Sequence, residues 1–406
     1  MDFSVVELDD DLAAFVAEVR DFLDTYVTEE VHDEERRTGG SFNLRLHKAL
    51  AAKGWIVPRW PVHKGGAGLD RVRERILELE FERVDAPSIT LGTTRLVLSA
   101  VEKYAAPDLA AELLPKVAAG DVRFCLGYTE PDGGSDIAAA RTRAVRDGDE
   151  WVVNGQKIFT TGAQNCQYTF LITRTDPELP KHKGLTMFLM PLDAPGVEIG
   201  PIRTVGGERT NVVYYSDVRI ADRNRLGPVN GGWAVLRGPL DEEHFGGGAD
   251  GGMSDLGIGT SWARMQGRAV AAAVRWAAAA RPDGTRPIDD PLVRARLGEA
   301  ATDVEGAIAT PGPMHRVRVS EVLLGGAADL VDLIGPEALL PHGADGCVAD
   351  GLFDYHHRFA QGTAIYGGTT EVFRNIIAQH VLGLPRPVYP ASKVLTAAGP
   401  TRKDRG

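Results

Sequence analysis

The residues best suited to chemistry in this sequence lie in short segments that join glycines to hydroxyl side chains. Gly133-Gly134 lets the main chain approach a ligand without a Cβ in the way, and the adjacent Ser135 offers a hydroxyl group. The turn Gly368–Glu371 precedes a predicted helix, and the free N–H groups at such a start suit a phosphate or a ribose. These residue types favour ligand binding, while a capped turn is the simpler interpretation of each segment taken alone.

The acidic run Asp241-Glu242-Glu243 is the best candidate for acid–base chemistry. Three neighbouring carboxylates repel one another, and this raises the pKa of at least one of them, as a base in an apolar site requires. The alternative is a solvated acidic turn of a helix, which is the commoner meaning of a charge run. The sequence pattern alone therefore leaves both interpretations open.

These segments must be positioned by elements that fall into three blocks. In Asp11–Val27 the apolar residues recur every three or four positions, which is typical of one face of an amphipathic helix. Short runs rich in β-branched and aromatic residues follow, separated by turns such as Asn154-Gly155. Helical patterns then return from Ser261–Ala280 to Thr370–Leu382. The predicted units are a helical domain at 1–121, a β-domain at 122–228, a helical domain at 229–385 and a loose tail at 386–406.

The same patterns assign further elements to each unit. Additional helices are predicted at Asn43–Gly54, Arg71–Val84, Leu96–Tyr104, Leu109–Ala119, Asp289–Ala309 and Val319–Ile334. Strands are predicted at Val122–Gly127, Trp151–Val153, Tyr168–Thr173, Leu185–Met190 and Asn211–Ile220.

Composition limits the class of protein. The 406 residues carry a net charge of −11, which argues against nonspecific nucleic-acid binding. No apolar run approaches the roughly 20 residues that a membrane span needs, and the N-terminus lacks a signal-peptide pattern. The three cysteines, Cys125, Cys166 and Cys347, show no metal-ligand spacing and are expected to be reduced and largely buried. We therefore expect a soluble cytoplasmic protein without a metal site.

Five segments together resemble one known family. Tyr128–Asp136 (YTEPDGGSD) and Asn154–Gly162 (NGQKIFTTG) are similar to the two flavin-binding signatures of acyl-CoA dehydrogenases, and Ile365–Ala378 resembles the C-terminal signature. The loop Trp60–Gly68 and the turn Asn230–Trp233 match as well, in the family's order. The resemblance implies an α+β fold with an N-terminal helical domain, a central antiparallel β-domain and a C-terminal domain of the four-helix type.

The resemblance also implies FAD as cofactor. Thr129 and Thr161 then offer hydroxyl groups to the flavin ring, and Phe159 stands where many relatives have tryptophan. The residues implied to contact FAD or the start of the CoA chain are Leu126, Tyr128, Thr129, Ser135, Phe159 and Thr161. Thr369 and Glu371 are implied at the adenosine half, and Arg281 and Gly335 at a neighbouring subunit's FAD, although the family's usual motif around Arg281 is absent.

The catalytic base departs from the commonest pattern of the family. Many relatives carry a glutamate directly after the tyrosine of the C-terminal signature, where this chain has Gly367. The N–H of Gly367 can still polarise a thioester carbonyl, because that contact needs only a donor. A second family arrangement places the base at Glu243, and the following His244 stands where relatives have arginine. Ser135, Gly367 and His244 are the residues implied at the substrate.

The activity implied is α,β-dehydrogenation of an acyl-CoA or related acyl thioester. A glutamate removes the Cα proton, hydride passes from Cβ to flavin N5, and a separate electron-transfer flavoprotein accepts the electrons. Gly367 and the seven glycines within 245–260 keep open a non-catalytic subunit that completes a partner's site. A flavin monooxygenase on the same fold is the third hypothesis. A homo- or hetero-oligomer, either a dimer or a tetramer, is expected, and the acyl group is not defined.

Overall fold

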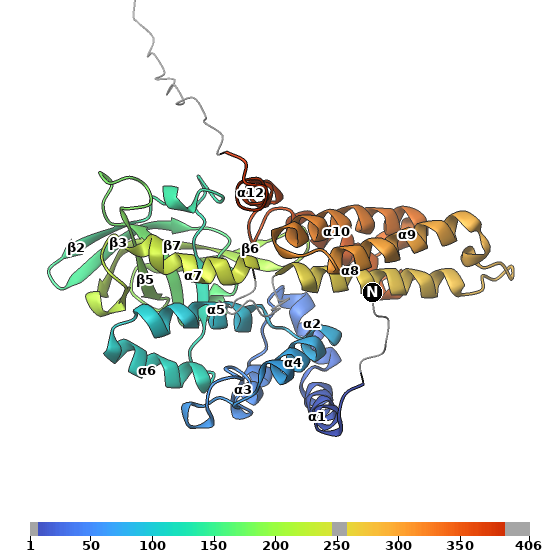
Figure 1. Ribbon diagram of the computed structural model, residues 1–406, viewed down its shortest axis with the longest axis horizontal. Helices are drawn as coiled ribbons and strands as arrows, with labels where there is room; N and C mark the ends of the chain where they lie inside the picture. Colours follow the sequence, from blue (N-terminus) through green and yellow to red (C-terminus); the bar gives the residue numbers. More distant parts are fainter. Residues whose placement is uncertain (1–6, 246–257, 386–406) are drawn as a thin grey trace, which may run out of the picture.

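The computed structural model describes residues 7–245 and 258–385, in which helices precede and follow a central sheet (Figure 1). The first unit consists of helices, and some of them start at a side-chain cap. Asp9, Asn43 and Asp70 each accept a hydrogen bond from the backbone N–H three residues further on. The helices are α1 (Asp10–Tyr26), α2 (Glu29–Thr38), α3 (Leu44–Ala52), α4 (Arg71–Arg83), α5 (Ile89–Tyr104) and α6 (Pro107–Ala118).

The central unit is a sheet with strand order β6-β7-β3-β2-β4-β5-β8, and β1 lies beside β4. Most neighbouring strands are antiparallel, as the sequence predicts. The exceptions are β1, which pairs with β4 in parallel, and one parallel residue pair between β2 and β4. A parallel pair needs a long crossover, and β2 and β3 supply it here. The strands are β1 (Phe124–Gly127), β2 (Arg143–Asp147), β3 (Glu150–Lys157), β4 (Tyr168–Arg174), β5 (Leu185–Pro191), β6 (Val197–Arg203), β7 (Arg209–Ala221) and β8 (Arg225–Leu226).

The last unit is again helical. Helices α8, α9 and α10 pack against one another and extend away from the sheet as long rods (Figure 1). Helix α11 packs on α10, and α12 continues into a π-helical turn, η8. The elements are α8 (Ile258–Ala278), α9 (Pro291–Ile308), α10 (Gly312–Ile334), α11 (Leu352–Thr363), α12 (Thr370–Ile376) and η8 (Ile377–Val381).

Helix α7 (Gly232–Phe245) joins the sheet to this helical unit. Its first residue has no side chain, and a Cβ there would lie only 2.8 Å from the Cα of Thr186 on β5. Glycine therefore allows the helix to start directly against the sheet. Helix α7 packs along α5 and also contacts α10, so its C-terminal half leads from the β-domain toward the last helices (Figure 1).

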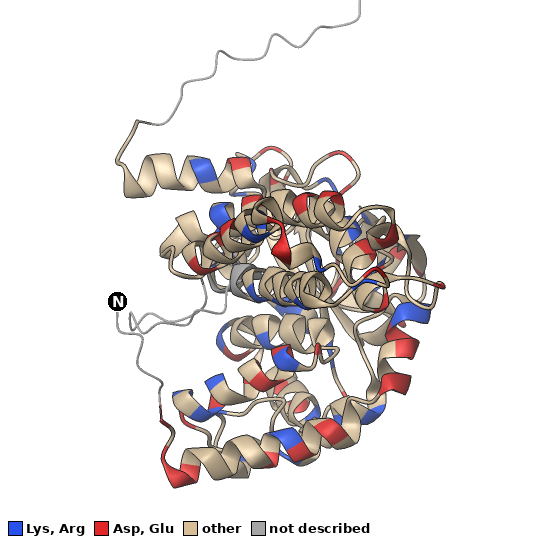
Figure 2. Ribbon diagram, turned by 90° about the vertical axis from the view of Figure 1, so that its right-hand side faces the viewer, with Lys and Arg blue, Asp and Glu red and all other residues tan. Residues whose placement is uncertain are grey.

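Acidic and basic residues are interspersed along the helices in Figure 2, so this view shows no extended basic face. Among the residues that the structure describes, no helix combines the length and apolar character needed to cross a bilayer. Cys125 and Cys166 are buried and Cys347 is partly exposed, and all three are free thiols.

Candidate active site

Strand β1 presents an open edge at the first flavin-like segment. One edge of β1 pairs with β4. On the opposite, outer edge, the N–H of Phe124 donates to Thr94 Oγ1 of α5 at 3.1 Å. The carbonyl of Phe124 accepts from Thr93 Oγ1 at 2.8 Å on that same side. Because backbone groups alternate along a strand, the N–H and C=O of Leu126 point to this outer edge too. No other described residue bonds to them there, so they are free to pair with the edge of a heterocycle.

A buried ion pair joins the two flavin-like segments. Lys157, at the end of β3, is completely buried, and its Nζ donates to Glu130 Oε1 at 2.7 Å and to the carbonyl of Tyr128 at 3.2 Å. The N–H of Ile158 donates to the carbonyl of Thr129 at 2.9 Å. These bonds hold residues 128–130 and 157–158 as one unit, so Thr129 is placed beside the segment that carries Phe159.

The surroundings keep both members of this pair ionised at neutral pH. Burial lowers the pKa of Lys157 to about 8, against the raising influence of the Glu130 carboxylate. Burial acts to raise the pKa of Glu130, but Lys157 and the N–H groups of Thr142 and Arg141 outweigh it, so the pKa lies below its usual 4.5. The two N–H groups donate to the carboxylate at 2.8 and 2.7 Å.

The direction of the Glu130 shift predicts a pH dependence. A carboxyl group whose folded-state pKa is lowered stabilises the fold fully above its unfolded pKa and loses this contribution as the pH falls through the folded value. We expect the free energy of unfolding to decline below about pH 4.5 in the native protein, and to decline less steeply in Glu130→Gln. Urea unfolding at a series of pH values measures both slopes, and identical acid slopes would contradict the assignment.

Phe159 has the geometry expected of a residue that meets a flat ligand. It is 59% exposed, although large aromatic side chains are usually buried, and it adopts a left-handed φ of 59°. Its neighbour Thr160 is buried and fixed by an N–H bond to the carbonyl of Asn211 at 2.9 Å. Next to it, the hydroxyls of Thr161 and Thr210 lie 3.0 Å apart. The combination of an exposed aromatic ring and a strained backbone makes Phe159 a candidate ligand contact.

These features fit FAD. The unsatisfied edge of Leu126, the exposed ring of Phe159 and the hydroxyl of Thr161 come from segments that Lys157 ties together. Gly133 has no atom within 4 Å of where its Cβ would lie, and the following Ser135 is exposed, so the backbone there is open to a ligand. Tyr128 is buried and packs edge-on against Phe170, as a support for the site.

Because Phe159 is strained, replacing it should change protein stability and FAD affinity in opposite directions. Phe159→Gly removes a left-handed residue that costs about 1–2 kcal/mol, so we expect a more stable apoprotein that binds FAD more weakly. Ala349→Gly is a matched control, because Ala349 also has a left-handed φ (49°), is exposed and lies in a different region. Melting curves with and without FAD measure both effects. Equal FAD affinity in the two variants would exclude Phe159 from the cofactor site.

The C-terminal signature forms a turn between α11 and α12. The ring of Tyr366 packs edge-on against Trp262 of α8, with ring centroids 5.2 Å apart. Gly367 and Gly368 follow with left-handed φ values of 65° and 85°. Thr369 caps α12 by accepting from the N–H of Val372 at 3.2 Å.

Glu371 is engaged within its own helix. It lies in the first turn of α12, accepts from Thr370 Oγ1 at 3.2 Å and pairs with Arg374 at 3.4 Å. These contacts match a helix-start carboxylate, so the structure gives no separate sign of an adenosine contact at Glu371.

Two predicted residues lie far from this region in the same chain. Arg281 follows α8 in the loop to α9, and its guanidinium lies over the ring of Trp276 at 5.6 Å. In Figure 1 this loop lies at the end of the helical unit away from the sheet. Gly335 ends α10 with a φ of 100°. Within the described residues, no hydrogen bond, ion pair or ring contact joins either of them to the flavin-like segments, and their predicted role at a neighbouring subunit's FAD stays a prediction.

The predicted base and its neighbour fall at the end of α7. The helix includes Glu243 and His244, but the side chains of residues 240–260 lie outside the described part of the structure. Helix α7 contacts α10, which in turn packs against α12 next to the Tyr366–Gly368 turn. The helix that carries Glu243 and the helix that follows the Gly367 turn therefore both contact α10.

Sequence reasoning missed Lys157 and Glu130 as organisers of the site. A signal was present, because Lys157 belongs to a strand in which Trp151 and Val153 are buried by alternation. A lysine at another buried position of that strand requires a partner, and the first signature offers three carboxylates, those of Glu130, Asp132 and Asp136.

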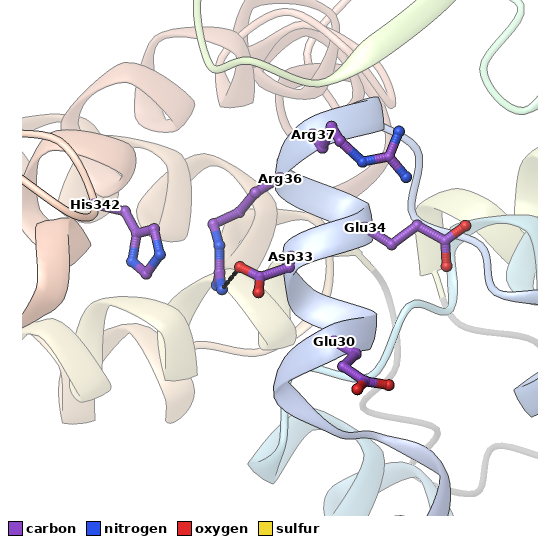
Figure 3. A pocket seen from close by; sticks show the side chains of 6 residues that line it. All are labelled: Glu30, Asp33, Glu34, Arg36, Arg37 and His342. Atoms are coloured by element: carbon purple, nitrogen blue, oxygen red, sulfur yellow. Dashed lines mark hydrogen bonds and ion pairs between the residues drawn. The ribbon is translucent and has the colours of Figure 1, made fainter.

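A surface pocket elsewhere on the chain is not formed by these segments. Figure 3 shows it between the face of α2 that carries Asp33 and Arg36 and the loop of His342. Ligand atoms of Glu29, Asp33 and His342 lie within 4.8 Å of one another, a spacing that a metal ion could use. Arg36, however, forms ion pairs with both carboxylates and so compensates part of their negative charge without a metal. We assign no role to this pocket.

Three domain families match the chain in order. The acyl-CoA dehydrogenase N-terminal domain matches residues 9–121, the middle domain 125–218 and the C-terminal domain 313–382. The chain therefore belongs to the acyl-CoA dehydrogenase family. It is an enzyme of that type, an oxidoreductase acting on CH–CH groups.

Individual relatives agree with this family. The chain is 36% identical to the acyl-CoA dehydrogenase IpdE1 of Mycobacterium tuberculosis, over 87% of this chain and 89% of that one. The solved ChsE4-ChsE5 complex from Mycobacterium tuberculosis gives a TM-score of 0.80 at 29% identity, covering 95% of this chain and all (100%) of that one. The Tcur3481-Tcur3483 steroid acyl-CoA dehydrogenase gives 0.78 at 30% identity, with coverage of 95% and 100%.

Proposed function

We propose that this chain catalyses the FAD-dependent α,β-dehydrogenation of an acyl-CoA thioester. The observation that carries the proposal is the exposed, strained Phe159. It follows directly on the segment that the buried Lys157–Glu130 pair ties to residues 128–130, and those residues continue from the open edge of Leu126. An aromatic ring and free backbone groups in one rigid unit suit a flavin ring.

Each residue then has a defined task. Leu126, Tyr128, Thr129, Phe159 and Thr161 hold the flavin end of the cofactor. FAD, when bound, supplies the acceptor for the hydride that leaves the substrate Cβ. Thr369, as the cap of α12, and Glu371 are proposed at the adenosine half, and Arg281 and Gly335 at the FAD of a neighbouring subunit.

The substrate requires two further groups. The N–H of Gly367 polarises the thioester carbonyl, which makes the Cα proton more acidic. Glu243 removes that proton, because a base on α7 replaces the carboxylate that Gly367 cannot provide. Ser135 and His244 are proposed to contact the CoA portion.

For the acyl group and the electron acceptor, we propose a chemical class and not a single compound or protein. One relative is described as a steroid acyl-CoA dehydrogenase, and this supports testing steroid-derived acyl-CoA thioesters alongside straight and branched short chains. A separate electron-transfer flavoprotein is proposed as the acceptor.

Product analysis tests this proposal. The purified protein is incubated with each thioester and an electron-transfer flavoprotein, and the products are identified by mass. An enoyl-CoA that is two hydrogens lighter than its substrate supports dehydrogenation. A product that gains an oxygen atom from O2 would instead indicate a monooxygenase.

A non-catalytic partner subunit is the second candidate. It is favoured by Gly367 at the usual base position, by Arg281 and Gly335 lying away from Phe159 in one chain, and by two-chain relatives such as the ChsE4-ChsE5 complex. If this chain is such a subunit, it binds little FAD alone, and co-expression with a second family member restores both flavin and turnover. Full flavin content and turnover of the chain alone would exclude it.

A further inference from the structure

Arg316 is an arginine enclosed within the C-terminal helices. It lies near the start of α10 and is only 5% exposed. Its guanidinium lies over the ring of Trp262 at 4.5 Å and over the ring of Phe373 at 5.5 Å. Arginine tolerates such an enclosure better than lysine does, because its planar group is weakly hydrated and stacks on aromatic faces.

The guanidinium donates hydrogen bonds to several backbone carbonyls around one turn. Nη2 donates to the carbonyl of Thr363 at 2.8 Å, to that of Tyr366 at 2.7 Å and to that of Gly368 at 3.0 Å. Nη1 donates to Ser320 Oγ, and Ser320 Oγ in turn donates to the carbonyl of Thr363 at 3.1 Å. Arg316 thus binds the carbonyl groups of the residues on both sides of Gly367.

These bonds decide where the Gly367 N–H points. In a planar trans peptide the C=O and the N–H point in opposite directions. The carbonyl of Tyr366 belongs to the same peptide unit as the N–H of Gly367, and it points to Arg316. The N–H therefore points away from Arg316, and within 7–245 and 258–385 no residue accepts a hydrogen bond from it.

A turn of this kind needs such a restraint. Gly367 and Gly368 both have left-handed φ values, of 65° and 85°, and glycine moves between backbone conformations at little cost. Without the charge-assisted bonds, a flip of the Tyr366–Gly367 peptide would exchange the N–H and the carbonyl. A carbonyl oxygen facing a thioester oxygen would repel it.

We propose that Arg316 is a positioning residue of the reaction, which holds the Tyr366–Gly367 peptide so that the Gly367 N–H faces the thioester carbonyl. The proposal rests on the acyl-CoA dehydrogenation described above, and it adds a residue that does not itself touch the substrate. On this proposal Arg316 sets the direction of the Gly367 N–H in addition to stabilising the turn.

The test compares two CoA ligands of equal length, a thioester and a thioether that lacks the carbonyl. The variants are Arg316→Met, Arg316→Lys and, as a milder change, Ser320→Ala. Arg318→Met is the matched control, because Arg318 lies on the same helix with a side chain 43% exposed and pairs with Asp303. Affinity for each ligand, kcat and FAD content are measured for all of them.

We expect Arg316→Met to lower kcat by about 10²-fold, the size of effect seen when one oxyanion donor is lost. The preference for thioester over thioether should fall about tenfold, with thioether affinity and FAD content unchanged. Arg316→Lys should recover part of the preference, and Arg318→Met should behave as the native protein. If Arg316→Met does not fold, Ser320→Ala should still reduce the preference.

Two negative results have different meanings. A native protein that prefers the thioester, with Arg316→Lys and Ser320→Ala variants that keep the same preference and kcat, would overturn the role of Arg316 alone. A native protein that neither prefers nor dehydrogenates any thioester would overturn the proposed function and this inference with it.

Discussion

Replacing Glu243 by glutamine is expected to reduce dehydrogenation by at least about 10²–10⁴-fold, the contribution of a general base, while FAD stays bound. Glutamine has nearly the same shape as glutamate but cannot accept the Cα proton. The loss is restricted to chemistry because α7 packs on α5 and β5, whereas the proposed flavin contacts come from β1 and the segment after β3. Anaerobic single-turnover reduction of the flavin measures the rate directly.

Glu242→Gln is the matched control for this variant. Successive residues on an α-helix point about 100° apart, so Glu242 and Glu243 cannot both face one substrate carbon. Native-like turnover in Glu242→Gln is expected. Retained turnover in Glu243→Gln, or an equal loss in both variants, would contradict Glu243 as the base.

Lys157→Met is expected to have the largest effect on stability. Lys157 is completely buried and Glu130 is 11% exposed, and removing one partner of a buried ion pair costs about 3–5 kcal/mol because the other charge is left uncompensated. The bond to the carbonyl of Tyr128 is lost as well. Both flavin-like segments should loosen together, so the melting temperature and the ratio of FAD to protein should fall in parallel.

Lys181→Met serves as the control for a lysine in the same domain. Lys181 is 51% exposed and pairs with Asp136 at 2.6 Å, and exposed pairs of this kind contribute little to stability. We expect its melting temperature and FAD content to match those of the native protein. If Lys157→Met kept native stability and full FAD content, the pair would not organise the site.

Much of the fold could be predicted from sequence patterns, and the misses have physical causes. Helix α2 has Val31 as its only apolar residue, so it shows no hydrophobic period. Helix α5 begins at Ile89 and not at Leu96, although its first turns contain three threonines and Gly92. These are poor helix formers in isolation. Burial and the bond from Thr94 Oγ1 to the carbonyl of Thr90 at 2.7 Å offset that preference.

In the β-domain, too, the local sequence does not predict every strand. Strand β2 carries three charged residues in five positions, and β6 contains both glycine and proline, so neither resembles a typical strand. Both form because β3 and β7 pair with them. Pairing partners are distant in sequence, and for this reason the parallel placement of β1 beside β4 was not predicted either.

Some residues of the candidate site could be predicted from the sequence and others could not. Residues carried by local motifs, such as Phe159 and Thr161, could be proposed from the sequence. Lys157 and Arg316 act through contacts with residues 27 and 50 positions away along the chain, and only the folded arrangement reveals them. The predicted FAD, Glu243 and His244 contacts stay predictions.

The most direct test of the account is the visible spectrum of the protein purified alone, followed by anaerobic addition of a panel of acyl-CoA thioesters. We predict that the chain carries a flavin and that one class of thioester bleaches it. A bound flavin that no thioester bleaches, or a chain that binds no flavin by itself, would contradict the proposal that this chain is the dehydrogenating subunit.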